Sequence, residues 1–123
     1  AGDVALEVEA PEPLPMLSAA VEVAAFRIAS EAIENVIRHA GASRCTVRFD
    51  VVGDLLRLAV SDDGVGLPAA PRAGVGSASM RERAAELGGT LTMDSLPERG
   101  ARVVAMLPLA RQRGPEEREP STR

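Results

Sequence analysis

Two polar side chains, Glu31 and Asn35, stand four residues apart in the segment EAIEN. This spacing places both on one face of a helix. The carboxamide oxygen of Asn35 is a hard ligand that suits Mg²⁺, and a carboxylate one turn earlier can orient a water or accept a proton. Asn is also unfavourable in the middle of a helix, because its side chain competes for backbone hydrogen bonds. The pair is therefore a candidate site for metal-assisted chemistry.

The same helix face also has a purely structural interpretation. Polar residues opposite the expected apolar stripe fit an ordinary solvated surface: Arg27, Ser30, Glu34 and Arg38. His39, the one histidine of the chain, continues this face on the next turn. From the helix alone both interpretations stay open, so the rest of the sequence must distinguish them.

A glycine-rich stretch, VSDDGVGLPAAPRAGVG, begins at the end of an expected strand. Asp-Gly commonly marks a tight turn between strands, but prolines and further glycines follow in place of a returning strand. The chain is therefore expected to leave the sheet here. Gly64 and Gly66 fit points of close approach to a ligand. An aspartate at the end of a buried strand needs a partner, and it could accept a hydrogen bond from an exocyclic amine such as that of adenine.

A second pair of glycines, Gly74 and Gly76, leads directly into a helical pattern. The N–H groups and the positive dipole end at a helix N-terminus favour phosphate. The stretch lacks the Gly-Lys-Ser/Thr of a P-loop, and GVGSAS lacks the third glycine of the dinucleotide-binding fingerprint. Neither of those phosphate-binding motifs therefore describes it.

Composition limits the classes of protein that fit. The chain has 123 residues, 46% hydrophobic and 2% aromatic, with a net charge of −4. The length suits one domain, and the lack of stacking aromatics and of a basic stripe argues against nucleic-acid binding. The single cysteine, Cys45, excludes an internal disulfide and is expected to pack in the core. Neither a signal peptide nor a membrane-spanning apolar run is visible, which favours a soluble, reducing compartment.

The first half of the chain predicts a strand and a long helix. Alternation predicts an edge strand at residues 4–10, and three-to-four spacing predicts a helix at residues 17–40. Ser18 is the expected N-cap and Gly41 the expected end. The predicted buried stripe consists of Val21, Ala24, Ala25, Ile28, Ala32, Ile33, Val36, Ile37 and Ala40.

The second half predicts two pairs of strands and a short helix. Residues 45–63 fit a hairpin whose loop, Gly53-Asp54, has the glycine first, as a type II′ turn requires. A helix is expected at residues 78–88, and strands at residues 90–95 and 101–109. Met80 and Met93 are expected in the core.

These elements predict an α+β two-layer sandwich: a mixed, mostly antiparallel sheet with helices packed on one face. Residues 1–109 would form the domain. Residues 110–123 are charged and lack apolar side chains after Ala110, so we expect a disordered tail.

Three motifs, in this order, resemble those of the ATP-binding catalytic domain of sensor histidine kinases. FRIASEAIENVIRHA resembles the N box, VSDDGVGLP the aspartate-glycine box, and GVGSASMRERAAELGG the second glycine box. That domain belongs to the GHKL superfamily and has the Bergerat fold. MRERAAELGG resembles the branch of nitrate and cell-envelope sensors. The resemblance spans residues 4–109.

The resemblance implies roles for the matched residues. Asn35 would hold Mg²⁺ on the ATP phosphates, Glu31 would be the acid near the reacting groups, and Arg38 would lie near the phosphates. Asp62, rather than Asp63, would bind the adenine amine.

Further nucleotide contacts are implied at Gly64, Gly66, Gly74, Gly76 and Ser77. Residues 67–79 would form a lid over the ATP. The sequence departs from the family's pattern at two positions, with Ser77 where the branch usually has Leu and Ala101 where a Thr is common. Arg81 and Arg83 would reach the triphosphate or the dimerisation domain, or lie on a solvated helix face.

The implied activity is transfer of the ATP γ-phosphate to a histidine on a separate dimerisation domain, which lies outside this sequence, with relay to a response regulator. His39 would have a supporting role and would not be the phosphoacceptor. The domain would be cytoplasmic, without membrane contact of its own, in a full-length protein with or without a membrane anchor. Two alternatives remain: a serine kinase of the anti-sigma-factor type and a non-catalytic docking module.

Overall fold

The computed structural model describes residues 3–13, 15–66 and 77–109. Residues 67–76 of the predicted lid, with Gly74 and Gly76, and the predicted tail at residues 110–123 lie outside the described residues. Residues 77–79, the end of the predicted lid, form the first residues of a helix (Ser77–Glu86). The side chains of His39, Ala40 and Ser77 are also not described.

Helix α1 (Ala19–Asn35) begins where the sequence supplies an N-cap. Ser18 Oγ accepts a hydrogen bond from the N–H of Val21 at 3.1 Å, which satisfies one of the donors that every helix start leaves unpaired. This confirms the predicted cap. The apolar stripe faces the sheet, with buried side chains at Val21, Ala24, Ala25, Ile28, Ala32 and Val36.

The last turn of the predicted helix is not α-helical. Val36–Ala40 form a π-helical turn, η1, which ends at Gly41 with a left-handed φ of 61°. A π-turn holds more residues than an α-turn, so it shifts the phase of the side chains. Val36 stays buried, but Ile37 is 61% exposed, so the prediction of a buried Ile37 is wrong. Gly41 ends the helical segment as predicted.

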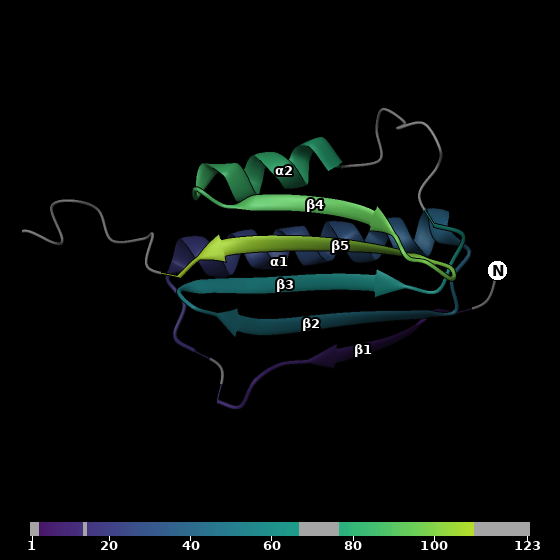
Figure 1. Ribbon diagram of the computed structural model, residues 1–123, viewed down its shortest axis with the longest axis horizontal. Helices are drawn as coiled ribbons and strands as arrows, with labels where there is room; N and C mark the ends of the chain where they lie inside the picture. Colours follow the sequence, from purple (N-terminus) through teal and green to yellow (C-terminus); the bar gives the residue numbers. More distant parts are fainter. Residues whose placement is uncertain (1–2, 14, 67–76, 110–123) are drawn as a thin grey trace, which may run out of the picture.

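In the described part of the chain the strands form one five-stranded sheet in the order β1-β2-β3-β5-β4. Only β1 and β2 pair in parallel; every other neighbouring pair is antiparallel. The strands are β1 (Ala5–Glu9), β2 (Arg44–Val52), β3 (Leu55–Asp62), β4 (Thr90–Ser95) and β5 (Ala101–Pro108). The predicted strands are therefore confirmed, and β5 lies between β3 and β4 (Figure 1).

A two-residue loop, Gly53-Asp54, joins β2 to β3. Gly53 has a φ of 62°, and no non-glycine residue among the described residues has a positive φ. A type I′ turn needs a positive φ at both central residues, whereas a type II′ turn needs it only at the first. The predicted II′ turn is confirmed, and it fixes the register in which Val52 faces Leu55.

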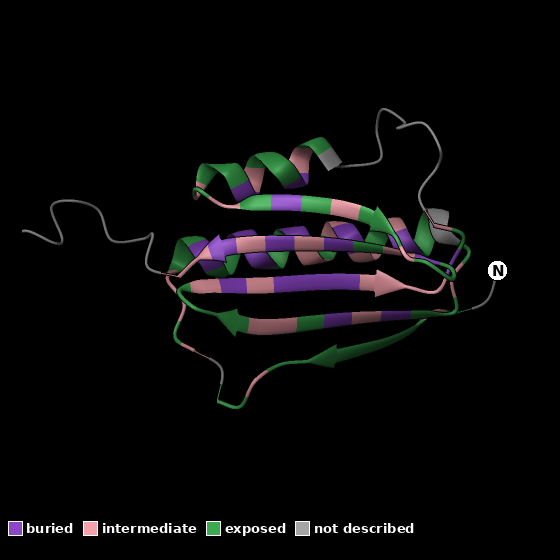
Figure 2. Cartoon of the chain, viewed as in Figure 1, coloured by how far each residue is buried: buried purple, intermediate pink, exposed green. Residues whose placement is uncertain are grey.

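Helices α1 and α2 (Ser77–Glu86) lie on one face of the sheet (Figure 1). Alternate strand residues face them and form the core, as the buried positions in Figure 2 show. One row crosses β2, β3 and β5 at Val47, Val60 and Val103, all of which are buried. Met80, on α2, is fully buried, and Met93 packs partly buried against the core. The α+β two-layer sandwich is confirmed.

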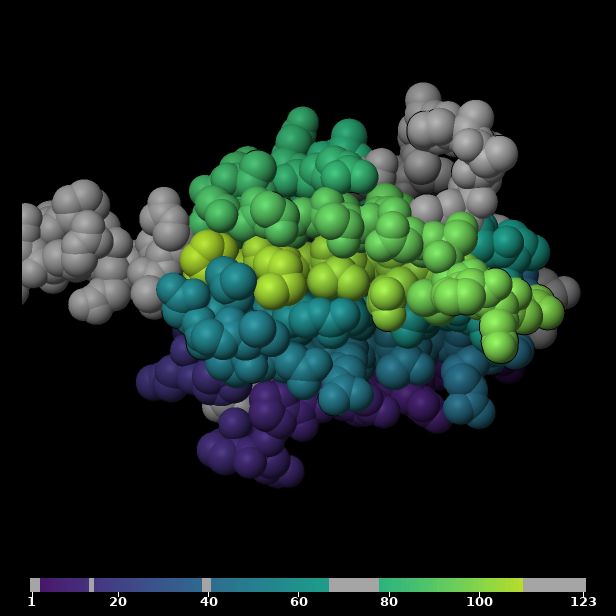
Figure 3. Space-filling view, in the orientation of Figure 1, coloured from purple at the N-terminus to yellow at the C-terminus, as the bar shows by residue number. Residues whose placement is uncertain are grey.

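The helix layer does not extend over β1. Leu6 and Val8 are opposite the buried residues Cys45 and Val47 of β2, yet they are 51% and 61% exposed. The opposite face of the sheet, turned to the viewer in Figure 3, carries the alternate strand side chains. No helix among the described residues is long and apolar enough to cross a membrane.

Candidate functional site

The C-terminal part of α1 carries the first two candidate residues. Glu31 and Asn35 are both half-buried, whereas the neighbouring polar residues Arg27, Ser30 and Glu34 are exposed. The solvated face and the candidate pair are thus two different faces of one helix. Asn35 is the last residue of α1, with helical φ and ψ of −64° and −38°, and η1 begins directly after it. π-turns occur frequently at functional sites.

Arg38 lies on the exposed side of η1. Its Nη2 atom is 3.1 Å from Glu34 Oε2, and both side chains are largely exposed. A pair of this kind along a helix contributes only a few tenths of a kcal/mol. The pair therefore leaves the guanidinium accessible to a stronger anionic partner, and the role of Arg38 at the phosphates stays a prediction.

Asp62 is the last residue of β3, and it lies on the sheet face that carries the helices. It is opposite Cys45 of β2, which is 1% exposed. Burial, together with the charge of Asp62, raises the pKa of the Cys45 thiol to about 11. Cys45 is a packing residue, as predicted. Asp62 Oδ1 accepts a hydrogen bond from the N–H of Gly64 at 2.7 Å, and this bond orients the carboxylate.

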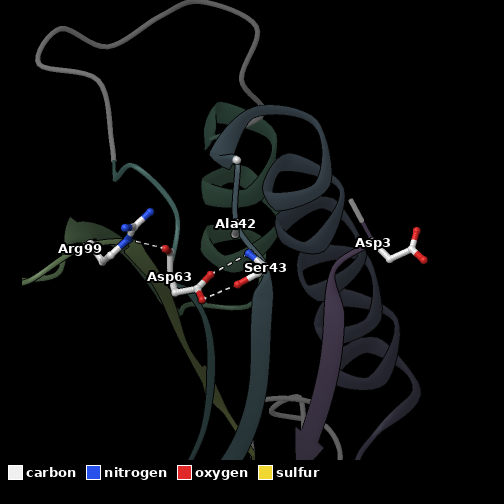
Figure 4. A pocket seen from close by; sticks show the side chains of 6 residues that line it. Asp3, Ala42, Ser43, Asp63 and Arg99 are labelled. Atoms are coloured by element: carbon white, nitrogen blue, oxygen red, sulfur yellow. Dashed lines mark hydrogen bonds between the residues drawn. The ribbon is translucent and has the colours of Figure 1, made fainter. Parts of the chain in front are cut away.

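The side chain of Asp63 points toward the segment that joins η1 to β2 (Figure 4). Its carboxylate accepts hydrogen bonds from the N–H groups of Arg44 and Ser43 and from the Ser43 hydroxyl. These bonds lower the pKa of Asp63 to about 2. The resemblance pointed to Asp62 rather than Asp63, and the signal for Asp63 in the sequence was the doubled acid in SDDG.

The loop between β4 and β5 packs closely against the loop after β3. A Cβ atom at Gly66, where φ is +87°, would lie 3.2 Å from Ser95 Oγ and 3.3 Å from the carbonyl oxygen of Gly100. A Cβ at Gly100, where φ is +97°, would overlap the carbonyl oxygen of Asp62. Gly66 was expected to approach a ligand. In this structure its close neighbours are other parts of the chain.

The structure brings the two halves of the candidate site to one end of the sheet. Three residues, 41–43, separate η1 from β2, and Cys45 of β2 is opposite Asp62 at the end of β3. The end of α1 and the loop at residues 62–66 therefore lie at the same end. Helix α2 (Ser77–Glu86) begins at the end that faces this side of the molecule (Figure 1).

Arg81 and Arg83, both on α2, lie against other parts of the chain. Arg81 Nη1 donates a hydrogen bond to the carbonyl oxygen of Leu91 at 2.8 Å, which ties α2 to β4. Arg83 and Glu86 line an apolar groove between α1 and α2, together with Val23 and Leu87. The predicted contacts of these arginines with a triphosphate or a second domain stay predictions.

A shallow polar depression of about 390 Å³ lies beside the candidate site. It is lined by Asp3, Gly41, Ala42, Ser43, Asp63 and Arg99, and Figure 4 shows how these side chains lie. None of the predicted nucleotide-binding residues in the described part of the chain lines it. The depression is the outer side of the hydrogen-bonded cluster around Asp63.

Known proteins are similar to this chain over most of its length. The family model described as "Histidine kinase-, DNA gyrase B-, and HSP90-like ATPase" matches residues 20–111. The chain is 40% identical over 93 residues to the signal transduction histidine-protein kinase/phosphatase UhpB of Salmonella typhimurium, covering 75% of this chain and 18% of that protein. It is 36% identical over 108 residues to the sensor histidine kinase LiaS of Bacillus subtilis, covering 85% of this chain and 30% of that one. The chain thus spans less than a third of each relative.

Among solved structures, the blue-light activated histidine kinase of Erythrobacter litoralis EL346 superposes with a TM-score of 0.78. It is 24% identical, and the match covers 91% of this chain and 37% of that one. At this identity the match shows the fold, and the fold agrees with the two-layer sandwich described above.

Proposed function

Because this chain belongs to the family of histidine kinase-, DNA gyrase B- and HSP90-like ATPases, we propose that it is the ATP- and Mg²⁺-binding catalytic domain of a sensor histidine kinase. Residues 1–109 form this domain and residues 110–123 its tail. It donates the γ-phosphoryl group of ATP to a histidine on a separate dimerisation domain, from which the group passes to a response regulator. The observation that carries the proposal is the meeting of α1 and the loop at residues 62–66 at one end of the sheet.

Asp62 is the adenine-binding residue in this proposal. Its Oδ1 atom accepts the Gly64 N–H, so the carboxylate is oriented before a ligand arrives, which lowers the entropic cost of binding. A carboxylate accepts a hydrogen bond from the exocyclic amine of adenine, whereas guanine has a carbonyl oxygen at that position. Selectivity for ATP over GTP follows.

The donor set near Asn35 fits Mg²⁺ bound mainly through phosphates. Among the described residues, no three His, Cys, Asp or Glu side chains gather into a metal-binding group. Mg²⁺ commonly takes one or two protein ligands and fills its remaining positions with phosphate oxygens and waters. Asn35 supplies an amide oxygen, and Glu31 supplies a carboxylate one turn away. When bound, the ion neutralises charge on the phosphates.

The protein's part in the transfer is positioning and charge stabilisation, because phosphoryl transfer requires little covalent chemistry from the enzyme. The start of α2 offers N–H groups to the phosphates, and Gly74, Gly76 and Ser77 are proposed to lie at this contact. Arg38 adds positive charge once it exchanges Glu34 for the phosphates. Glu31 is proposed to orient the reacting groups.

Calorimetric titration tests the nucleotide site. We expect the wild-type domain to bind ATP with Mg²⁺ and to bind GTP much more weakly. Asp62→Asn should raise the Kd for ATP about tenfold or more, because an amide N–H would face the amine. Asn35→Ala should weaken binding in the presence of Mg²⁺ more than in EDTA. Asp54→Asn, in the hairpin loop at the opposite end of the sheet, is the matched control and should bind like the wild type.

A transfer assay distinguishes the kinase proposal from its alternatives. The domain is mixed with a histidine-bearing dimerisation domain of a related sensor kinase and γ-labelled ATP. Label that is stable in alkali and lost in acid identifies phosphohistidine and supports the proposal. Acid-stable label favours a serine kinase, and a folded domain that binds no nucleotide favours a docking module.

A further inference from the structure

We propose that Asp63 is a positioning residue for nucleotide recognition: it holds the loop after β3 so that the neighbouring Asp62 presents its carboxylate to the adenine. This inference rests on the proposed function, since it takes Asp62 as the adenine-binding group. It assigns a role to the second acid of the SDDG segment, which the proposed function leaves unused.

Asp63 joins segments that are far apart in the sequence. Its Oδ1 accepts hydrogen bonds from the N–H groups of Ser43 at 2.8 Å and Arg44 at 3.0 Å, and its Oδ2 accepts one from Ser43 Oγ at 2.9 Å. Its own N–H donates to the carbonyl oxygen of Arg44 at 3.3 Å. On the other side, Arg99 Nε donates to the carbonyl oxygen of Asp63 at 2.8 Å. Figure 4 shows the Ser43 and Arg99 contacts.

These bonds hold both the side chain and the main chain of Asp63. The entrance to β2 holds the carboxylate, and the β4–β5 loop holds the carbonyl oxygen. Hydrogen bonds to an ionised carboxylate are shorter and stronger than neutral ones. The main chain at residue 63 therefore has little freedom, although this segment is a bend outside the regular ladder.

Asp62 and Gly64 flank this fixed residue. Asp62 depends on the N–H of Gly64 for the orientation of its Oδ1 atom, and both groups move if the peptide between them rotates. Ser43 follows η1 within a few residues, so the same cluster also sets the distance between the loop and the end of α1. Asp63 thus acts through Asp62 and need not touch the nucleotide.

A double-mutant cycle tests this coupling. At a temperature where every variant is folded, Asp63→Ala should raise the Kd for ATP about tenfold and reduce the preference for ATP over GTP. Asp63→Asn keeps an oxygen that can accept the two N–H groups, so it should recover most of the affinity. In the Asp62→Asn background, Asp63→Ala should cause no further loss. Asp54→Ala is the matched control. Unchanged affinity in Asp63→Ala, or a fully additive loss in the double variant, would overturn the inference.

Amide hydrogen exchange provides a readout that needs no nucleotide. Asp63→Ala should remove the protection of the Gly64 N–H and leave that of Ile28, in the core of α1, unchanged. If the wild type binds no ATP, the proposed function fails. Gly64 protection then still reports whether Asp63 orients the Asp62 carboxylate: retained protection in Asp63→Ala overturns that part independently.

Discussion

Cys45 is the only side chain of this sequence expected to change charge between about pH 9 and pH 11, because the chain contains no Tyr and all 14 of its Lys and Arg residues are Arg. Arginine remains protonated throughout this range. Burial, with a contribution from Asp62, raises the pKa of the thiol from its ordinary value of 9.0 to about 11. Alkaline titration of the domain therefore reports on one residue in the core beside the candidate site.

The sign of the effect on stability follows from this shift. Well below pH 9 the thiol is protonated in both the folded and the unfolded chain, and its contribution is fully present. As the pH rises toward about 11, the unfolded chain loses the proton first, so the free energy of unfolding falls. We expect urea unfolding to show this fall in the wild type. A wild type and a Cys45→Ala variant with equal slopes between pH 9 and 11 would contradict the prediction.

The loops after β3 and between β4 and β5 act as one element at the candidate site. Gly100 is the point of closest approach, because a Cβ atom there would overlap the Asp62 carbonyl oxygen and φ is +97°. We expect Gly100→Ala to lower the free energy of unfolding by about 3 kcal/mol or more, from backbone strain and steric overlap together. Urea denaturation measures the loss.

Gly53→Ala is the matched control for this prediction. Gly53 also has a left-handed φ, of +62°, but a Cβ atom there meets nothing within 4 Å. Only the conformational cost remains, about 1 kcal/mol. If the two variants were equally destabilised, the contact between the loops would contribute nothing to the free energy of unfolding. The conclusion that the β4–β5 loop holds the main chain at Asp62 would then be wrong.

At the scale of the whole molecule, the fold depends on burial between α1 and the sheet. Ile28 is fully buried in this layer, whereas Ile37 in η1 is 61% exposed. We expect Ile28→Ala to cost about 2–5 kcal/mol through lost burial and the cavity left behind, and Ile37→Ala to cost less than about 1 kcal/mol. Both are read from chemical denaturation at one pH. A large loss in Ile37→Ala would mean that its side chain packs in solution.

The local secondary structure was predictable from the sequence. The N-cap at Ser18, the II′ turn at Gly53, the alternation of β2 and β3 and the left-handed end at Gly41 all agree with the structure. Each depends on residues within a few positions of one another, so the pattern holds the information needed. The π-turn after Asn35 was not predictable in this way, because a single shifted turn leaves no distinct period in five residues.

The candidate site was likewise predictable only in part from the sequence. Residue types and spacing alone singled out Glu31, Asn35, the end of β3 and the glycines. Only the tertiary structure decided that β5 lies between β3 and β4, that Gly100 supports Asp62, and that Asp63 bonds to Ser43, twenty residues away. The physical reason is that these contacts join segments distant in the sequence, and their geometry exists only once the sheet has brought those segments to one end.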